Sequence, residues 1–118
     1  MANALAKQCA EDFDGAIARV ENPIQGDFSG VPTFIKDTDE VPGLPRFLGS
    51  RALPGDISTK LSKAARQLVD SGLNYLGTTT TPEFGLTGTT ESLKFGATRT
   101  PWNLCLLYTS PSPRDYGT

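Results

Sequence analysis

Lys36 is the residue of this sequence whose type and position most clearly allow chemistry, because it follows a β-branched and aromatic run and precedes Asp37. A lysine amine acts as a general base only when it is neutral, although the reference pKa of lysine is about 10.4. Desolvation behind residues 31–35 would favour the neutral amine, whereas the carboxylate of Asp37 would favour the ammonium ion. Both protonation states stay open, and by pattern alone a solvated lysine at a strand end is the commoner case.

Glu83 and Glu91 form a second candidate, a pair of carboxylates in a segment rich in glycine and threonine. Two such groups can serve as acid and base in hydrolysis. Within Pro-Glu-Phe-Gly, we expect Glu83 to accept backbone amide hydrogen bonds and so to hold an irregular loop. The threonine run 78–81 is expected to be a loop that lines a substrate cleft, and Trp102 a packing anchor.

Composition excludes several classes of site. With no histidine and only two cysteines, Cys9 and Cys105, we expect no imidazole-ligated metal, no Ser-His or Cys-His catalysis and no disulfide framework. The net charge of -2 leaves no basic surplus for nucleic acid or an anionic membrane. No apolar run approaches the roughly 20 residues that cross a bilayer, and the start lacks a signal-peptide core. We therefore expect a cytoplasmic protein without a cofactor.

The elements that position these residues begin with a predicted helix. Apolar side chains recur at every fourth position, at residues 5, 9, 13 and 17, with alanines between them. This spacing predicts an amphipathic helix over residues 2–20, with those four side chains on its apolar face. Asn22-Pro23 is expected to end the helix, because proline cannot continue it.

A strand, a helix and a second strand follow. Residues 31–35 predict a strand with Lys36 at its exit, and the glycines and prolines of residues 41–56 predict an ordered surface loop. Asp56 is expected to cap a helix that ends at Gly72, a residue suited to a left-handed C-terminal cap.

The next expected strand covers residues 73–77, and residues 78–104 are expected to be a long loop. The order strand, helix, strand predicts an α/β fold with a parallel or mixed sheet.

The C-terminal end has an unusual composition. Residues 105–115 read Cys-Leu-Leu-Tyr-Thr-Ser-Pro-Ser-Pro-Arg-Asp, which is the translation of a transposon adapter used to prepare sequencing libraries. We therefore expect residues 105–118 to be a non-native, disordered tail, and residues 1–104 to be the N-terminal fragment of a domain. A natural linker rich in proline and serine is the alternative.

Short motifs along residues 28–103 resemble, in order and approximate spacing, the start of the amidase signature family. They are Gly30-Val31-Pro32, Lys36-Asp37, Gly49-Ser50-Arg51, Leu76-Gly77, Pro82-Glu83-Phe84-Gly85, Thr89-Thr90-Glu91, Phe95-Gly96, Thr98-Arg99 and Pro101-Trp102-Asn103. The resemblance implies a partial α/β/α fold, a mixed sheet flanked by helices. It also implies an amide hydrolase that uses a Ser-cisSer-Lys triad and an acyl-enzyme on a small-molecule amide, with Lys36 as the triad lysine.

In that family a Gly/Ser-rich segment with both serines follows Pro-Trp-Asn, whereas this sequence enters the adapter-like tail. Ser110 and Ser112 lie beside prolines there, without a glycine-rich loop that could present amides to an oxyanion. We therefore expect the fragment to be inactive. Two alternatives stay open: a glutaminase-type subunit of a tRNA-dependent amidotransferase, and a non-catalytic truncated binding protein. The oligomeric state is also open.

Overall fold

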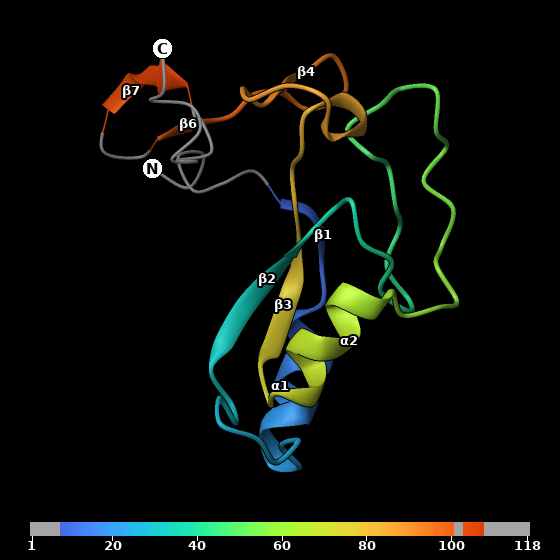
Figure 1. The fold of residues 1–118 in the computed structure, drawn as a ribbon, viewed down its shortest axis with the longest axis vertical. Coiled ribbons are helices and arrows are strands. Elements are labelled where there is room, and N and C mark those ends of the chain that lie inside the picture. Colours follow the sequence, from blue (N-terminus) through green and yellow to red (C-terminus); the bar gives the residue numbers. More distant parts are fainter. Residues whose placement is uncertain (1–7, 101–102, 108–118) are drawn as a thin grey trace.

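The computed structural model describes residues 8–100 and 103–107 of the 118-residue chain. Its centre is a three-stranded sheet in the order β1-β3-β2 (Figure 1). The elements of this part are β1 (Gln8–Glu11), α1 (Phe13–Glu21), β2 (Pro32–Lys36), α2 (Lys63–Asp70) and β3 (Asn74–Thr79). β2 runs parallel to β3 and β1 runs antiparallel to it, so that the sheet is mixed. The predicted α/β class is confirmed.

The N-terminal segment differs from the helix predicted over residues 2–20. Residues 8–11 form β1, and α1 begins only at Phe13. The strand pairs with residues 77–79 along one edge of β3. Backbone hydrogen bonding to this edge therefore overrides the helical spacing of the apolar residues. Residues 1–7 lie outside the described part of the chain.

The face of α1 that packs on the sheet also differs from the expected apolar stripe. Ala16 is buried, whereas the side chains of Phe13 and Ile17 are 44% and 65% exposed. The contact is partly polar, because Asn74 Nδ2 donates a hydrogen bond to the carbonyl oxygen of Ala16 at 3.0 Å. α1 ends at Glu21 with Asn22 as its C-cap, as the following proline predicted.

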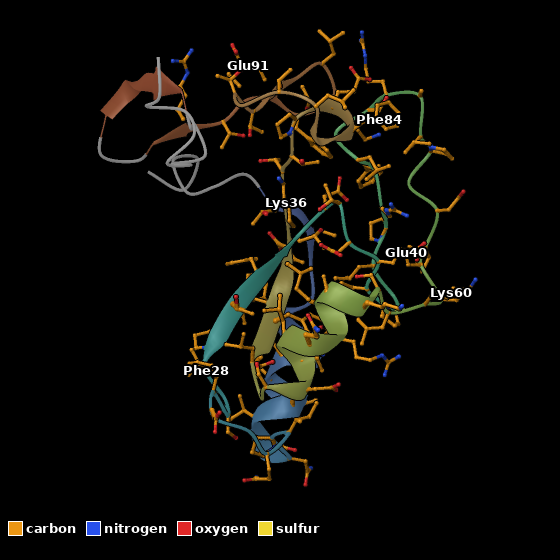
Figure 2. The ribbon with its side chains drawn as sticks, viewed as in Figure 1. Phe28, Lys36, Glu40, Lys60, Phe84 and Glu91 are labelled. Atoms are coloured by element: carbon orange, nitrogen blue, oxygen red, sulfur yellow. The ribbon has the colours of Figure 1, made fainter. Side chains whose placement is uncertain are left out.

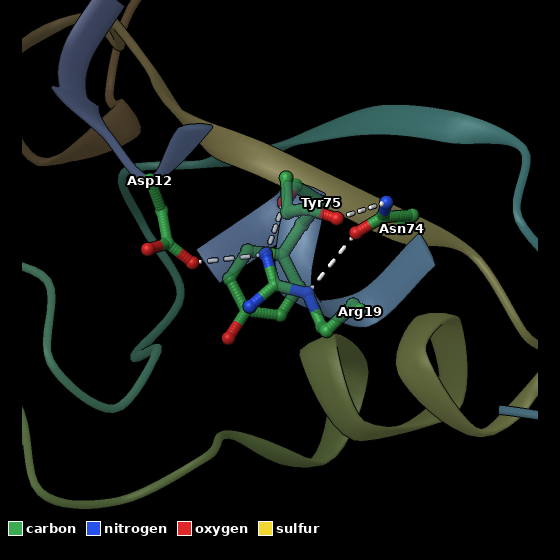
Figure 3. Close-up of polar contacts among 5 residues, drawn as sticks. Asp12, Arg19, Asn74 and Tyr75 are labelled. Carbon is green, nitrogen blue, oxygen red and sulfur yellow. Dashed lines mark hydrogen bonds and ion pairs between the residues drawn. The ribbon is translucent and has the colours of Figure 1, made fainter. Parts of the chain in front are cut away.

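Arg19 fastens α1 to the start of β3 (Figure 3). Its Nε donates to Asn74 Oδ1 at 3.0 Å, and its Nη2 donates to the carbonyl oxygen of Tyr75 at 2.6 Å. The same Nη2 lies 2.9 Å from Asp12 Oδ2, and the guanidinium carbon lies 3.8 Å from the centre of the Tyr75 ring. A planar guanidinium suits this combination of directed hydrogen bonds and stacking. A polar network, rather than an apolar stripe, therefore holds α1 in place.

The apolar core lies between β2, α2 and the loop of residues 41–56. Its buried members are Ile35, Val41, Leu44 and Ala65, with Ala10, Leu61 and Tyr75 packed against them. Successive side chains of a strand point to opposite faces of the sheet. Because Ile35 points into the core, its neighbours Phe34 and Lys36 point to the other face.

α2 begins at Lys63, later than the helix predicted from Asp56. Ser62 is the N-cap, since its Oγ accepts a hydrogen bond from the amide of Ala65 at 3.2 Å. The same hydroxyl donates to Asp39 Oδ1 at 2.6 Å. The helix is therefore capped by Ser62, whose hydroxyl group both accepts and donates a hydrogen bond, and not by Asp56.

This difference is testable by substitution. We expect Ser62→Ala to lower the free energy of unfolding by about 1 kcal/mol, because an N-cap oxygen is lost. Asp56→Ala is expected to change it by less than about 0.5 kcal/mol, as is usual for an exposed residue. Urea denaturation followed by circular dichroism measures both values. A larger loss for Asp56→Ala than for Ser62→Ala would contradict this assignment of the cap.

The two connections that flank α2 have the conformations predicted from their glycines and prolines. The loop of residues 41–56 contains no helix or extended strand, as predicted, and touches the next segment through an isolated bridge between Pro45 and Ile57. Gly72 follows the end of α2 with φ of 94°, which confirms the left-handed cap.

The segment predicted as a loop over residues 78–104 contains short elements, and β3 extends into it. They are a 3-10 turn (Glu83–Gly85), β4 (Glu91–Ser92), β5 (Gly96–Ala97), β6 (Arg99–Thr100) and β7 (Asn103–Leu107). β4 pairs with β5 and β6 with β7, both antiparallel. Residues 105–107 thus lie in a strand, whereas residues 108–118 and Trp102 fall outside the described residues. The adapter-derived tail and the packing role of Trp102 stay predictions.

Candidate active site

Lys36 is the last residue of β2 and lies in register with Thr79 of β3. Because these strands are parallel, their C-terminal ends meet at one edge of the sheet, where open α/β sheets bind their ligands. Figure 2 shows Lys36 at this edge, on the side of the segments that carry Phe84 and Glu91. The sheet therefore places Lys36 where a catalytic side chain is expected.

Of the two surroundings that the sequence left open for Lys36, the structure shows the solvated one. Its side chain is exposed, and Phe34, on the same face of β2, is itself 37% exposed. The apolar residue of the strand that is fully buried, Ile35, points to the opposite face. Within the described residues, the strand therefore positions the amine without burying it.

A pocket of about 260 Å³ opens beside Lys36. It is lined by Phe34, Lys36, Thr79, Thr80, Pro82, Thr87, Gly88 and Thr90. Thr79 and Thr80 of the threonine run line this pocket, and Thr78 and Thr79 belong to β3 rather than to the predicted loop. That the run lines a substrate cleft stays a prediction. One aromatic wall and several hydroxyl groups suit a small ligand with both polar and apolar parts.

Asp37 has a role that the sequence analysis missed. Its side chain is 0% exposed, and its two carboxylate oxygens accept hydrogen bonds from the amides of Phe47 at 3.0 Å and Gly49 at 3.3 Å. Its own amide donates to the carbonyl oxygen of Thr79 at 3.1 Å, which continues the strand pairing past Lys36. Asp37 therefore organises the loop of residues 41–56. The available signal was a carboxylate followed by a glycine- and proline-rich loop whose amides need acceptors.

Glu83 holds an irregular segment, as expected, but through a different partner. Its Oε1 accepts a hydrogen bond from Ser50 Oγ at 2.5 Å, rather than from backbone amides. Glu83 also lines a second pocket, of about 300 Å³, together with the exposed Glu91. The two carboxylates thus lie at one pocket, and the hydrogen bond from Ser50 favours the structural interpretation of Glu83.

Two residues near these contacts have an unusual backbone conformation. Leu48 and Phe84 are the non-glycine residues with positive φ among residues 8–100 and 103–107, at 50° and 51°. The amide of Phe84 donates to the carbonyl oxygen of Leu48 at 2.8 Å, so that the two strained residues are joined directly. Such a conformation costs about 1 to 3 kcal/mol per residue and persists where the surrounding contacts fix it.

The described part of the chain contains neither a membrane-spanning helix nor a cluster of metal-ligating side chains. None of its helices is long and apolar enough to cross a membrane. That part also contains no group of three or more His, Cys, Asp or Glu side chains that could hold a metal ion.

Comparison with known sequences identifies the family. Residues 1–108 match the family profile described as Amidase. One subunit of the glutamyl-tRNA(Gln) amidotransferase from Gloeobacter violaceus is 36% identical over 99 residues, which cover 84% of this chain and 20% of that protein. A putative amidase, AmiC, from Mycobacterium bovis is 41% identical over 76 residues, which cover 64% of this chain and 16% of that protein.

Solved structures agree with this match. The 6-aminohexanoate cyclic dimer hydrolase superposes with a TM-score of 0.79 and 30% identity, over 87% of this chain and 22% of that chain. A bacterial aryl acylamidase of the amidase signature family superposes with a TM-score of 0.77 and 30% identity, over 91% of this chain and 24% of that chain. The chain thus spans about a fifth of the length of these relatives. The profile match, the sequence identities and the shared fold together show that the chain belongs to the amidase signature family of amide hydrolases.

Proposed function

We propose that this chain is the N-terminal part of an amide hydrolase in which Lys36 is the lysine of a Ser-cisSer-Lys triad. The observation that carries the proposal is the position of Lys36 at the C-terminal end of a parallel strand, beside a pocket, in a chain of the amidase signature family. The substrate class is a small-molecule carboxamide. Nucleic acid and membrane are not among the proposed partners.

In the proposed reaction, the nucleophilic serine attacks the amide carbonyl carbon. The proton of this serine passes to the cis-serine, and the proton of the cis-serine passes to the neutral amine of Lys36. The tetrahedral intermediate then expels ammonia or an amine, and the proton held at Lys36 returns through the cis-serine to the leaving nitrogen. Water afterwards attacks the acyl-enzyme by the same proton route and releases the carboxylic acid. Lys36 carries the proton in both halves, so that it must cycle between neutral and charged forms.

We further propose that the 118-residue chain does not catalyse this reaction by itself. The residues that follow Asn103 contain no Gly/Ser-rich segment, and Ser110 and Ser112 each lie beside a proline. Neither serine is therefore a candidate nucleophile with an oxyanion hole.

A second candidate function is the glutaminase-type subunit of a tRNA-dependent amidotransferase, which would release ammonia from glutamine. The identity of 36% with the Gloeobacter violaceus amidotransferase sequence favours it. It uses the same triad, so that Lys36 would keep the same role.

The test uses the full-length protein encoded by the source gene, with the 118-residue chain assayed in parallel. We expect the full-length protein to release ammonia or an amine from at least one member of a panel of aliphatic and aromatic carboxamides, and the 118-residue chain to release none above the buffer rate. Release from glutamine alone would replace the first candidate by the second. No release from any amide would support a non-catalytic binding protein, and release by the 118-residue chain would overturn the proposed inactivity.

A further inference from the structure

We propose that Asp37, Ser50 and Glu83 are positioning residues that fasten the loop of residues 41–56 to the exit of β2 and to the segment after β3, whose Pro82 lines the Lys36 pocket. The inference rests on the proposed function for its catalytic meaning, because it concerns the geometry around the proposed triad lysine. The three residues come from three separate segments: the exit of β2, the loop itself and the 3-10 turn after β3.

The first attachment is at the exit of β2. Asp37 follows Lys36 directly and is fully buried, and its carboxylate receives the amides of Phe47 and Gly49. A carboxylate that accepts two backbone amides in a buried site makes strong, directed hydrogen bonds. The loop is therefore tied to the residue next to the amine.

The second attachment is at the segment after β3. Ser50 is 1% exposed, and its Oγ accepts from the amide of Ala52 at 3.2 Å while it donates to Glu83 at 2.5 Å. The hydroxyl group thus uses its donor and one acceptor position. Glu83 directly follows Pro82, which lines the Lys36 pocket. The loop is therefore also tied to a wall of that pocket.

The backbones of the loop and the wall are in direct contact between these two attachments. A side-chain carbon added at Gly49 would lie 2.4 Å from the carbonyl oxygen of Thr81, and Gly49 itself has φ of 67°. The strained residues Leu48 and Phe84 face each other across the same contact through their backbone hydrogen bond. Strained backbone clusters where function requires one exact geometry.

The loop thus connects the exit of β2 with the segment after β3, although none of its residues lines the pocket. Through the Ser50–Glu83 hydrogen bond it supports the pocket wall at Pro82 from behind. If this bond is lost, the wall is released from the loop and Lys36 becomes more accessible. If only the charge of Glu83 is lost, the wall stays in place.

The test measures the accessibility of Lys36 in the 118-residue chain, and it needs no enzyme activity. The chain is acylated with a small amine-reactive reagent, and peptide mass spectrometry gives the ratio of the labelling rates of Lys36 and Lys63. Lys63 is an exposed residue at the start of α2 and serves as the internal reference. The variants are Ser50→Ala, Glu83→Ala, the double variant and Glu83→Gln.

We expect Ser50→Ala and Glu83→Ala each to raise the ratio, by at most about fivefold, which is the factor that one net hydrogen bond corresponds to and an upper limit for a lysine that is already exposed. The double variant is expected to raise it no further, because both substitutions break the same bond. Glu83→Gln keeps an oxygen that accepts from Ser50 and is expected to restore the ratio of the unchanged chain. Since Glu83 is exposed, the comparison of its Ala and Gln variants holds even if Ser50→Ala impairs folding.

An unchanged labelling ratio in Glu83→Ala would overturn the proposal, and so would additive effects in the double variant. The proposal would also fail if Glu83→Gln behaved as Glu83→Ala, because that result would indicate that the charge of Glu83 matters rather than its hydrogen bond. These results are independent of the proposed function. If Lys36→Ala leaves amide hydrolysis by the full-length protein intact, the proposed triad fails while the labelling ratio still reports whether the loop holds the pocket.

Discussion

Lys36→Ala in the full-length enzyme is expected to lower kcat for amide hydrolysis by about 10²- to 10⁴-fold, the usual contribution of a positioned general acid or base. KM is expected to change little, because the amine takes part in proton transfer rather than in holding the substrate. Steady-state release of ammonia from the best amide of the panel measures both constants.

Two further variants make this result specific. Lys36→Arg keeps a positive charge that cannot be given up, so we expect it to be as inactive as Lys36→Ala if the neutral amine is the base. Lys63→Ala removes an exposed lysine at the start of α2 and is expected to keep the kcat of the unchanged enzyme. Normal turnover by Lys36→Ala would remove Lys36 from the mechanism, and an active Lys36→Arg would assign it a purely electrostatic role.

Asp37→Ala is expected to lower the free energy of unfolding of the 118-residue chain by about 2 to 6 kcal/mol. The substitution leaves the part-buried amide of Phe47 and the buried amide of Gly49 without their carboxylate acceptors, at up to about 3 kcal/mol for each donor. Since a small domain has about 5 to 15 kcal/mol of stability in total, a large part of it depends on this one side chain. Urea denaturation followed by circular dichroism measures the loss.

Asp27→Ala is the matched control, because Asp27 is exposed and its removal is expected to change the stability by less than about 0.5 kcal/mol. Asp37→Asn keeps one carbonyl oxygen, which can accept a hydrogen bond from one of the two amides. We therefore expect it to lose about half as much stability as Asp37→Ala. Equal stabilities of Asp37→Ala and Asp27→Ala would contradict the assigned role of Asp37.

The strands around the site were predictable because their signals are local. Residues 31–35 combine β-branched and aromatic side chains behind a turn, and the structure shows β2 at Pro32–Lys36. Residues 73–77 follow a left-handed glycine cap, and β3 begins at Asn74. Each of these strand signals depends only on neighbouring residues, and the tertiary contacts of the two segments agree with the local preference for a strand.

The N-terminal segment was not predictable in the same way. Its spacing favours a helix, but residues 8–11 gain backbone hydrogen bonds from β3, which lies far along the chain. The cap of α2 was misplaced for a related reason, since Ser62 is held by Asp39 from a distant loop. Both outcomes depend on long-range contacts that local propensity does not contain.

For the site, the sequence predicted residues that lie within recognisable motifs, but not the contacts between distant segments. Lys36 was found through its place in an ordered set of family motifs, and the structure adds the pocket and the parallel strand pair. The glycine- and proline-rich loop after Asp37 signals a need for acceptors, but the two amides that Asp37 accepts lie 10 and 12 residues away in a loop without regular structure, so local pattern does not identify them. The Ser50–Glu83 contact joins residues more distant still.

The most direct test of the central claim is to sequence the source gene beyond the codon for Asn103. We predict that the reading frame continues into a Gly/Ser-rich segment with two serines, which would complete a triad with Lys36. A gene that instead encodes Cys105 to Thr118 followed by a stop codon would contradict the claim, because no nucleophile would then exist for Lys36 to serve.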